Sequence, residues 1–237
     1  MHKILRMASL WRMLPSCMRS RLGLRLMLLL WLVIVLALIS TRFVGRGCRK
    51  RVFAYRDQLE ESTHAVATVL DELGLRFFLC YGSLWGQVHE RRNPPWEADA
   101  ELCVLSEQDD SAADRLQDRL VMALDAAGFL AEQDGRLGRY DVYRTDGTPG
   151  LVQIVFFAPD AANKMYRRDG WMHRSHPAVC TGDTADPQLH CFPARLVAAP
   201  LERRPFGAHH LPVPWLGFEI QKYLFPNTWF RDYAPIC

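Results

Sequence analysis

The chain has 237 residues, of which 49% are hydrophobic and 23% charged, a balance typical of one well-buried domain and not of a disordered or fibrous chain. The formal net charge of +3 combines two unlike regions, because residues 1–51 hold 11 Lys and Arg and no Asp or Glu, while the remainder holds 18 basic and 26 acidic residues. An acidic remainder does not offer the phosphate-neutralising surface of a nucleic-acid-binding protein, so no nucleic acid is expected as a partner.

An apolar run in the basic region predicts a membrane span. The run, Leu26–Thr41, is bounded by Arg25 and Arg42, and its 16 residues would extend roughly 24 Å as a helix, short of a hydrocarbon core of roughly 27 to 30 Å. Residues 22–44 are long enough when the flanking arginines extend to the headgroups. We therefore expect one N-terminal transmembrane helix. A cleaved signal peptide is the alternative, which the long charged region and the absence of a small-x-small cleavage site disfavour.

This span sets the expected domain organisation. We expect a cytosolic basic tail at 1–21, a transmembrane signal-anchor at 22–44, a basic linker at 45–57 and a folded domain at 58–237. The chain is then a single-pass type II protein of the Golgi or endoplasmic reticulum membrane, with its domain in the lumen, although the Lys and Arg counts on the two sides of the run hardly decide the orientation.

A lumenal location would place the cysteines in an oxidising environment, where disulfides persist. Cys180 and Cys191 lie in a polar loop and are the predicted pair. A zinc site in the same loop is the alternative, built with three histidines at a spacing that fits no strong zinc template, namely His173, His176 and His190. Cys80 and Cys103 lie inside apolar segments and are predicted to be plain core residues.

The first elements of the domain follow from hydrophobic periodicity. Apolar residues recur at helical spacing over 53–73, and Gly74 provides a C-terminal stop, so this segment is predicted to be an amphipathic helix. A strand is predicted at 75–81, with the sequence LRFFLCY. Gly82 and Ser83 then mark a turn from that strand into a short helix.

The remaining elements predict a mixed sheet. A strand at 98–105 follows a proline pair, and a second amphipathic helix is predicted at 111–127. Residues 139–145 and 151–158 are predicted to form a hairpin around Asp-Gly, and a helix is expected near 216–224. This order indicates an α/β (α+β) domain with a mixed β-sheet.

Acidic residues occupy every second position at the start of the strand after the proline pair. Because strand side chains alternate between faces, Glu97, Asp99 and Glu101 are expected to share one face and to repel one another unless a cation lies among them. Mg²⁺ and Mn²⁺ prefer such oxygen ligands. The Gly82-Ser83 turn offers backbone N–H groups that can hold a phosphate. The alternative is an edge strand whose outer face is merely solvated.

Two separated blocks of the sequence resemble the LicD/fukutin family, which includes bacterial phosphocholine transferases and fukutin-related ribitol-phosphate transferases. The central block is Tyr81–Gly86 (YGSLWG) followed by Pro95–Val104 (PWEADAELCV), and the second contains short proline-rich pieces between Phe192 and Pro214. The resemblance covers about residues 60–230. Two matching blocks are more specific than a single short motif.

The resemblance implies a nucleotidyltransferase-like fold for 58–237 and a metal-assisted site that moves a phosphorylated alcohol from a CDP-linked donor onto a glycan or glycoprotein. Asp99 and Glu101, with Glu97 beside them, are then the expected ligands of Mg²⁺ or Mn²⁺. The expected donor-binding positions are three residues of the first block, namely Gly82, Ser83 and Gly86. Association with other glycan-modifying enzymes is a further expectation.

The chain departs from the family pattern at three positions. A third acid, usual in a later strand, is replaced by Gln153, and the middle acid of the acidic triplet is Ala98. The Arg-His pair of the family becomes His89-Glu90, and His89 is kept as a candidate base or phosphate ligand, with a plain helix-surface histidine as the alternative. An amide can offer an oxygen to a metal but cannot take a proton from an attacking hydroxyl.

Two functions therefore stay open at the level of sequence. The first is an active phosphotransferase in which Asp99, Glu101, Gln153 and His89 carry the chemistry. The second is a catalytically degenerate relative that binds a nucleotide donor or a glycan as a non-catalytic partner. The retained Asp-x-Glu favours the first, and Gln153 favours the second.

Overall fold

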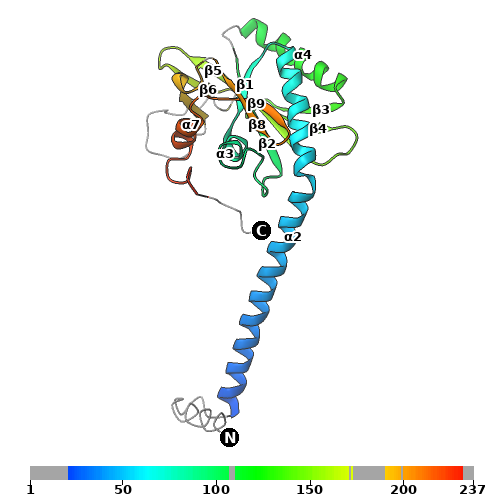
Figure 1. Cartoon of the computed structure of the whole chain (residues 1–237), viewed down its shortest axis with the longest axis vertical. Helices are drawn as coiled ribbons and strands as arrows, with labels where there is room; N and C mark the ends of the chain where they lie inside the picture. Colours follow the sequence, from blue (N-terminus) through cyan, green and yellow to red (C-terminus); the bar gives the residue numbers. More distant parts are fainter. Residues whose placement is uncertain (1–20, 107–109, 171, 173–189, 199, 232–237) are drawn as a thin grey trace. The chain divides into compact units, whose positions relative to one another are not determined.

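The computed structural model describes residues 21–106, 110–170, 172, 190–198 and 200–231 (Figure 1). The chain divides into two compact units, the first formed by Met1–Cys48 with Ile236–Cys237 and the second by Arg49–Pro235. The long helix α2, Arg21–Glu72, begins in the first unit and ends in the second. It passes without interruption through the segment predicted as a basic linker at 45–57.

The predicted transmembrane helix at 22–44 is corrected by the structure. The apolar run does lie in a helix, α2, but among the described residues no helix is both long and apolar enough to cross a membrane.

The folded unit is built on a mixed sheet, as predicted. Its strand order is β1-β2-β5-β4-β3, with β6 paired to the far part of β5 and β7 paired to β6. The pair β2–β5 is parallel, and the other described pairs of this sheet are antiparallel. The bounds are β1 Arg76–Leu79, β2 Asp99–Leu105, β3 Phe129–Asp134, β4 Arg139–Arg144, β5 Leu151–Asp160, β6 Met165–Arg168 and β7 Cys191–Pro193.

The predicted hairpin at 139–145 and 151–158 is confirmed as the antiparallel pair β4–β5. The sequence analysis missed β3, which pairs with β4, and the short pair β6–β7. It also missed a two-stranded sheet of β8, Glu202–Phe206, and β9, His209–Val213. These strands are short or carry polar residues in succession, so they lack the alternation that marks β2.

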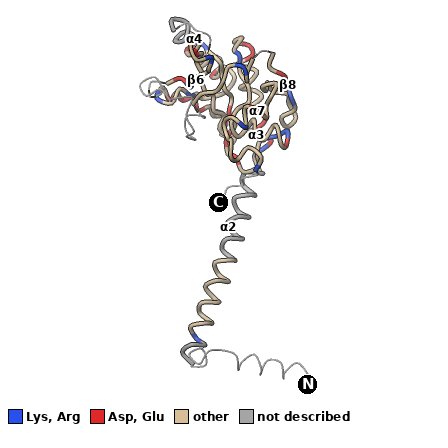
Figure 2. Tube along the Cα trace, turned by 90° about the vertical axis from the view of Figure 1, so that its left-hand side faces the viewer, with Lys and Arg blue, Asp and Glu red and all other residues tan. Residues whose placement is uncertain are grey.

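Helices cover the sheet through apolar faces. The second half of α2 contributes buried side chains to the core, among them Leu59, Val66 and Leu70, each worth about 1.5 to 3 kcal/mol of burial. The helix α4, Asp110–Ala126, packs beside β3, and α3, Tyr81–Glu90, lies beside α7, Gly217–Leu224 (Figure 1). A short 3₁₀ helix, η2, spans Ala194–Val197. Acidic and basic residues are interspersed over the folded unit in Figure 2.

Two cysteines of the core are joined, which corrects the prediction that Cys80 and Cys103 are unpaired. Cys103 lies opposite Phe78 in the β1–β2 register, and Cys80 follows β1 directly, so the two Cα atoms are 5.7 Å apart and the sulfurs form a disulfide. Such a separation is the usual one for a disulfide. Both residues are almost fully buried. The bond ties the turn after β1 to the strand that carries the acidic residues.

The predicted pair in the polar loop stays a prediction. Cys191 is buried and disulfide-bonded, but Cys180, His173 and His176 lie outside the described residues. The zinc alternative for that loop therefore stays open as well. His190 lies inside the described residues and borders the central cavity of the folded unit.

Replacing Cys80 and Cys103 together by alanine is expected to lower the free energy of unfolding by about 3 kcal/mol, because the bond constrains the unfolded chain across a sequence separation of 23 residues. Urea unfolding of the oxidised wild type and the double variant measures the difference. A difference below about 1 kcal/mol between oxidised wild type and variant would contradict the prediction.

Candidate functional site

The turn between β1 and α3 is held in a conformation that is unusual for a tyrosine. Tyr81 has φ 46°, in the left-handed region that non-glycine residues seldom adopt. Two contacts fix the turn: the Gln221 side chain donates to the Tyr81 carbonyl at 2.9 Å, and the Cys80 N–H donates to the Glu101 carbonyl at 3.1 Å. The turn therefore presents Gly82 and Ser83 directly to the acidic end of β2.

Ser83 and Glu101 are joined by three hydrogen bonds. The Ser83 N–H donates to Glu101 Oε2 at 3.0 Å, the Ser83 hydroxyl lies 2.9 Å from the same oxygen, and the Glu101 N–H donates to Ser83 Oγ at 2.8 Å. Ser83 is fully buried, and its hydroxyl also lies 3.2 Å from Asn93 Oδ1. In this structure Ser83 thus positions the Glu101 carboxylate, while the phosphate contact expected of it stays a prediction.

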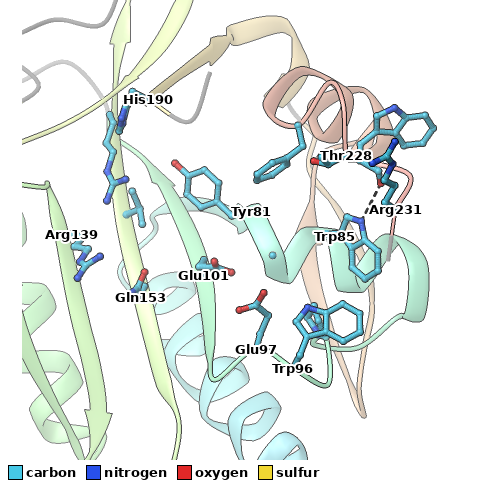
Figure 3. Close-up of a pocket in the computed structure, with 16 residues that line it drawn as sticks. Tyr81, Trp85, Trp96, Glu97, Glu101, Arg139, Gln153, His190, Thr228 and Arg231 are labelled. Atoms are coloured by element: carbon cyan, nitrogen blue, oxygen red, sulfur yellow. Dashed lines mark hydrogen bonds between the residues drawn. The ribbon is translucent and has the colours of Figure 1, made fainter. Parts of the chain in front are cut away.

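A cavity of about 460 Å³ opens beside this turn (Figure 3). Glu97 and Glu101 lie at the centre of that view, with Gln153 and Arg139 on one side and Trp85 and Trp96 on the other. The acidic side chains come from β2 and the loop before it, those of Arg139, Gln153 and Arg168 from β4, β5 and β6, and the tryptophans from α3, the loop before β2 and the segment after α7. The other lining residues include Tyr81, Gly82, Arg168, Phe225, Thr228 and Trp229.

The three acidic residues form a cluster of like charge. The position that a Cβ of Gly82 would take is 3.5 Å from Glu101 Oε2 and 3.6 Å from Glu97 Cδ, so both carboxylates lie against the turn. Within the described ranges no basic side chain forms an ion pair with Glu97, Asp99 or Glu101. The three carboxylates therefore lie near one another without an ion-paired protein cation, although the positive charge of Arg139 acts on Asp99.

Burial and mutual repulsion raise the pKa values of all three groups. Burial, followed by the charge of Asp99, raises the pKa of Glu97, and burial, followed by the charge of Asp141, raises the pKa of Asp99. Burial and the neighbouring charges raise the pKa of Glu101 to about 8, against the opposing effect of the Ser83 hydrogen bonds. A carboxyl with this pKa is largely protonated at neutral pH unless a cation favours its charged form.

The cluster is not a closed metal site as it stands. Among the residues that the structure describes, no three His, Cys, Asp or Glu side chains gather closely enough to hold a metal ion together. The donors nonetheless have the right chemistry, because oxygen ligands suit Mg²⁺ and Mn²⁺, and a cation would relieve the repulsion described above.

The structure shows the surroundings of Gln153, the residue that stands where the family usually has a third acid. Gln153 of β5 lies beside Glu101 of β2 in the parallel register and beside Asp141 of β4 in the antiparallel register. Residues paired in this way point to the same face of a sheet, so the three side chains form one row. Asp141 accepts from Arg139 Nη2 at 3.1 Å through Oδ2, while its Oδ1 is buried without a hydrogen-bond partner among the described residues.

Two predicted site residues lie away from the carboxylates. His89 is exposed, stacks on Trp85 at a ring-centroid distance of 4.3 Å, and has Nε2 3.2 Å from the Trp229 carbonyl oxygen. It does not border the cavity. Gly86 is buried, and a Cβ there would lie 2.3 Å from the Arg92 carbonyl oxygen. Gly86 therefore permits the close approach of the loop after α3.

Other contributors were not predicted from the sequence. Trp85, Trp96 and Trp229 form an aromatic wall of the cavity. A buried polar chain reaches the site from α2: Glu60 Oε1 accepts from the Asn93 N–H at 3.1 Å, and Asn93 Nδ2 donates to the Asp99 carbonyl at 3.2 Å. The run Asn93-Pro94-Pro95 carried no signal for this role beyond a turn.

The comparisons with solved structures show weak similarity. The Vibrio cholerae DncV 3'-deoxy GTP bound form is 13% identical, with a TM-score of 0.28 and coverage of 56% of this chain and 48% of that chain. Vibrio cholerae DncV cyclic AMP-GMP synthase with the linear intermediate 5' pppA(3',5')pG, and the DncV apo form, are 12% identical, with the same TM-score and coverage. This chain thus spans about half the length of those structures.

The comparison with protein families identifies the family of this chain. No curated protein matches the chain by sequence. A family model described as LicD/FKTN/FKRP, nucleotidyltransferase domain, matches residues 74–215, which include the Gly82-Ser83 turn, the acidic strand and Gln153. Because this match covers more than half of the chain, the protein belongs to the LicD/FKTN/FKRP nucleotidyltransferase-domain family.

Proposed function

We propose that this chain is a metal-assisted phosphotransferase that moves a phosphorylated alcohol, of the ribitol-phosphate or phosphocholine type, from a CDP-activated donor onto a glycan. Family membership supports a nucleotide-related transferase in general. The CDP donor, the glycan acceptor and the metal are our proposals, drawn from the resemblance of the central sequence block and from the chemistry of the cavity.

The cluster of Glu97, Asp99 and Glu101 is the observation that carries this proposal. The three carboxylates are at least half-buried and form no described ion pair, and those of Glu97 and Glu101 lie beside the Gly82-Ser83 turn. Burying unpaired carboxylates destabilises a fold, so an arrangement of this kind suits a site where a bound cation offsets the cost. An exposed, solvated edge strand, the alternative considered from the sequence, does not fit their burial or the parallel pairing of β2 with β5.

The acidic cluster and its neighbours have distinct parts in the proposed reaction. Glu97 and Glu101 border the cavity, whereas Asp99, Ser83 and Asp141 are not among its lining residues. Asp99 and Glu101, with Glu97 beside them, would hold Mg²⁺ or Mn²⁺, which when bound supplies positive charge to the transferred phosphoryl group. Ser83 fixes the orientation of the Glu101 carboxylate. The acceptor hydroxyl must lose a proton, and Asp141, next to Gln153 in register, is our candidate to take it.

The aromatic wall suits the nucleoside part of the donor. Trp85, Trp96 and Trp229 border the same cavity as Glu97, and aromatic faces stack on nucleobases with an energy of about 1 to 3 kcal/mol per base. The cavity volume of about 460 Å³ lies within the range of small-molecule sites, roughly 300 to 1,000 Å³. Its size and lining therefore fit a nucleotide.

A second candidate function is binding without turnover. Gln153 borders the cavity at the position in register with Glu101, and an amide there cannot accept the proton of an attacking hydroxyl. In this reading the chain holds a nucleotide donor or a glycan as the non-catalytic partner of another glycan-modifying enzyme.

We propose that the domain works in the lumen of the Golgi or endoplasmic reticulum. The buried Cys80–Cys103 disulfide supports this location, because disulfides persist in oxidising compartments and are rare in the cytosol. A protease-protection assay on sealed microsomes tests it. Residues 58–237 should resist protease added outside, and their digestion would contradict a lumenal domain.

Binding and turnover of a CDP-linked donor test the function. We expect CDP-ribitol or CDP-choline to raise the melting temperature by roughly 5 to 10 °C when Mn²⁺ is present at saturating ligand, and much less with EDTA. CMP release in the presence of glycan acceptors is measured in parallel. Metal-dependent stabilisation with CMP release supports the transferase, stabilisation without CMP release selects the binding partner, and the absence of any metal-dependent effect contradicts the proposed site.

A further inference from the structure

The part of the cavity that β4 and β6 line carries two arginines. Arg139 of β4 and Arg168 at the end of β6 both border the cavity that Glu97 and Glu101 border. In the sheet register Arg139 lies opposite Val155 and Arg168 opposite Phe157. Val155 and Phe157 stand two and four residues after Gln153 on β5, so both arginines share its face.

The two guanidinium groups lie near each other in a partly buried place. Burial, and to a lesser extent the positive charge of Arg139, lower the pKa of Arg168. Arg167, the next residue along the strand, lies opposite Ala158 and so points to the other face, where it is ion-paired with Asp160. The strand thus sends one arginine to an acidic partner and the other into the cavity.

Much of the hydrogen-bonding capacity of the two arginines is unused. Arg168 donates from Nε to the Leu137 carbonyl at 3.0 Å, and no carboxylate in the described part of the chain forms an ion pair with it. Arg139 pairs with Asp141 through Nη2, while its Nε is buried without a hydrogen-bond partner among the described residues. A guanidinium has five N–H donors in a fork that matches phosphate oxygens. Such a pair is suited to an anion.

Gln153, which lies between Glu101 and the strand that carries Arg139, does not repel an anion. Gln153 is neutral and separates Glu101 from Asp141 in the row across the strands. A carboxylate at this position would repel a bound phosphate, whereas the amide can donate a hydrogen bond to it. The neutral Gln153 and the two arginines on this face of the sheet therefore all favour the binding of an anion.

We propose that Arg139 and Arg168 form a phosphate-binding subsite, which holds a phosphoryl group of the substrate on the same face of the sheet as Gln153 and Glu101. This subsite deepens the proposed function, on which it rests for the identity of the substrate. A phosphate held there would lie between the guanidinium groups and the acidic cluster with its proposed cation. Its ligand class is an organic phosphate or diphosphate ester, supplied either by the nucleotide or by a phosphorylated alcohol.

Metal-free binding isolates the subsite from the proposed reaction. Binding of inorganic pyrophosphate, CMP and glycerol 3-phosphate to the full-length chain is measured by calorimetry in EDTA at pH 6. Arg168→Gln should weaken binding by about 10- to 100-fold, the value of a charge-assisted hydrogen bond. Arg168→Lys keeps the charge without the fork and should recover part of this loss. Arg136→Gln, at an exposed arginine of the β3–β4 turn, is the matched control and should bind as wild type.

The outcomes separate this subsite from the proposed function. Arg168-dependent binding without CMP release in the turnover assay supports the subsite even though the transferase fails. Tighter binding of CMP than of glycerol 3-phosphate assigns the subsite to the nucleotide, and the reverse order assigns it to the phosphorylated alcohol. Wild-type binding by Arg168→Gln, an equal loss in Arg136→Gln, or no metal-free binding of any of the three probes to the wild type would overturn the subsite.

Discussion

Replacing Asp99 with asparagine is expected to lower CMP release at least about 10³-fold, with the fold retained. The amide has the size of the carboxylate but lacks its charge, so the proposed cation loses a ligand. Charge stabilisation by a metal is worth several kcal/mol, and each 1.36 kcal/mol corresponds to a factor of ten in rate. The measurement is CMP release from the CDP donor at saturating Mn²⁺, together with the melting temperature of the metal-free chain.

The matched control for this substitution is Asp125→Asn, the same change at an exposed position of α4. Asp125 belongs neither to the acidic cluster nor to the lining of the cavity, so its variant should retain wild-type turnover and metal dependence. The two variants are distinguished further by Mn²⁺, which should stabilise the control and wild type but stabilise Asp99→Asn much less. Turnover of Asp99→Asn within a few-fold of wild type would remove Asp99 from the site.

The acidic residues of the candidate site could be predicted from the sequence because the pattern that reveals them is local. Alternation along a strand depends only on neighbouring residues, so the shared face of Asp99 and Glu101 followed from their spacing. The glycine-serine turn was found for the same reason. The hydrogen bonds that join Ser83 to Glu101 then confirmed that the two segments meet, across 18 residues of sequence.

The features that sequence reasoning missed all depend on register between distant strands. The Cys80–Cys103 disulfide follows from the pairing of β1 with β2, and the inclusion of Arg168 follows from the pairing of β6 with β5. A shift of one residue in either register would turn these side chains to the opposite face. Asp141 illustrates the same point, because its position beside Gln153 stayed open until the β4–β5 register was known.

His89 illustrates a different limit of prediction from sequence. A histidine near a phosphate-binding turn is compatible with acid-base chemistry, and its sequence position alone did not separate that role from a surface role. The structure places its ring against Trp85 and its Nε2 beside the Trp229 carbonyl, through contacts with a segment 140 residues away. In this structure His89 packs against the aromatic wall, and its part as a base or phosphate ligand stays a prediction.

The metal-free chain is expected to lose stability as the pH rises from about 5 to 8, because of the acidic cluster. The pKa of Glu101 is raised to about 8 in the folded state from an ordinary value near 4.5, so the folded state binds the proton more tightly than the unfolded state. The stabilising effect of the protonated form is full below about pH 4.5 and is lost progressively up to about pH 8. At 1.36 kcal/mol per pKa unit, the loss is at most about 5 kcal/mol.

Glu101→Gln isolates this effect, because glutamine accepts the same Ser83 hydrogen bonds without taking a charge into the cluster. Urea unfolding in EDTA at pH 5 and pH 8 should show a clearly smaller loss of stability for the variant than for wild type, although the pKa values of Glu97 and Asp99 are raised in the same direction. Mn²⁺ should reverse most of the wild-type loss at pH 8, since it binds the ionised carboxylates. Equal pH dependence in the two proteins would mean that Glu101 is not held in an unfavourable charged state, and the electrostatic reason for a cation at this turn would then be lost.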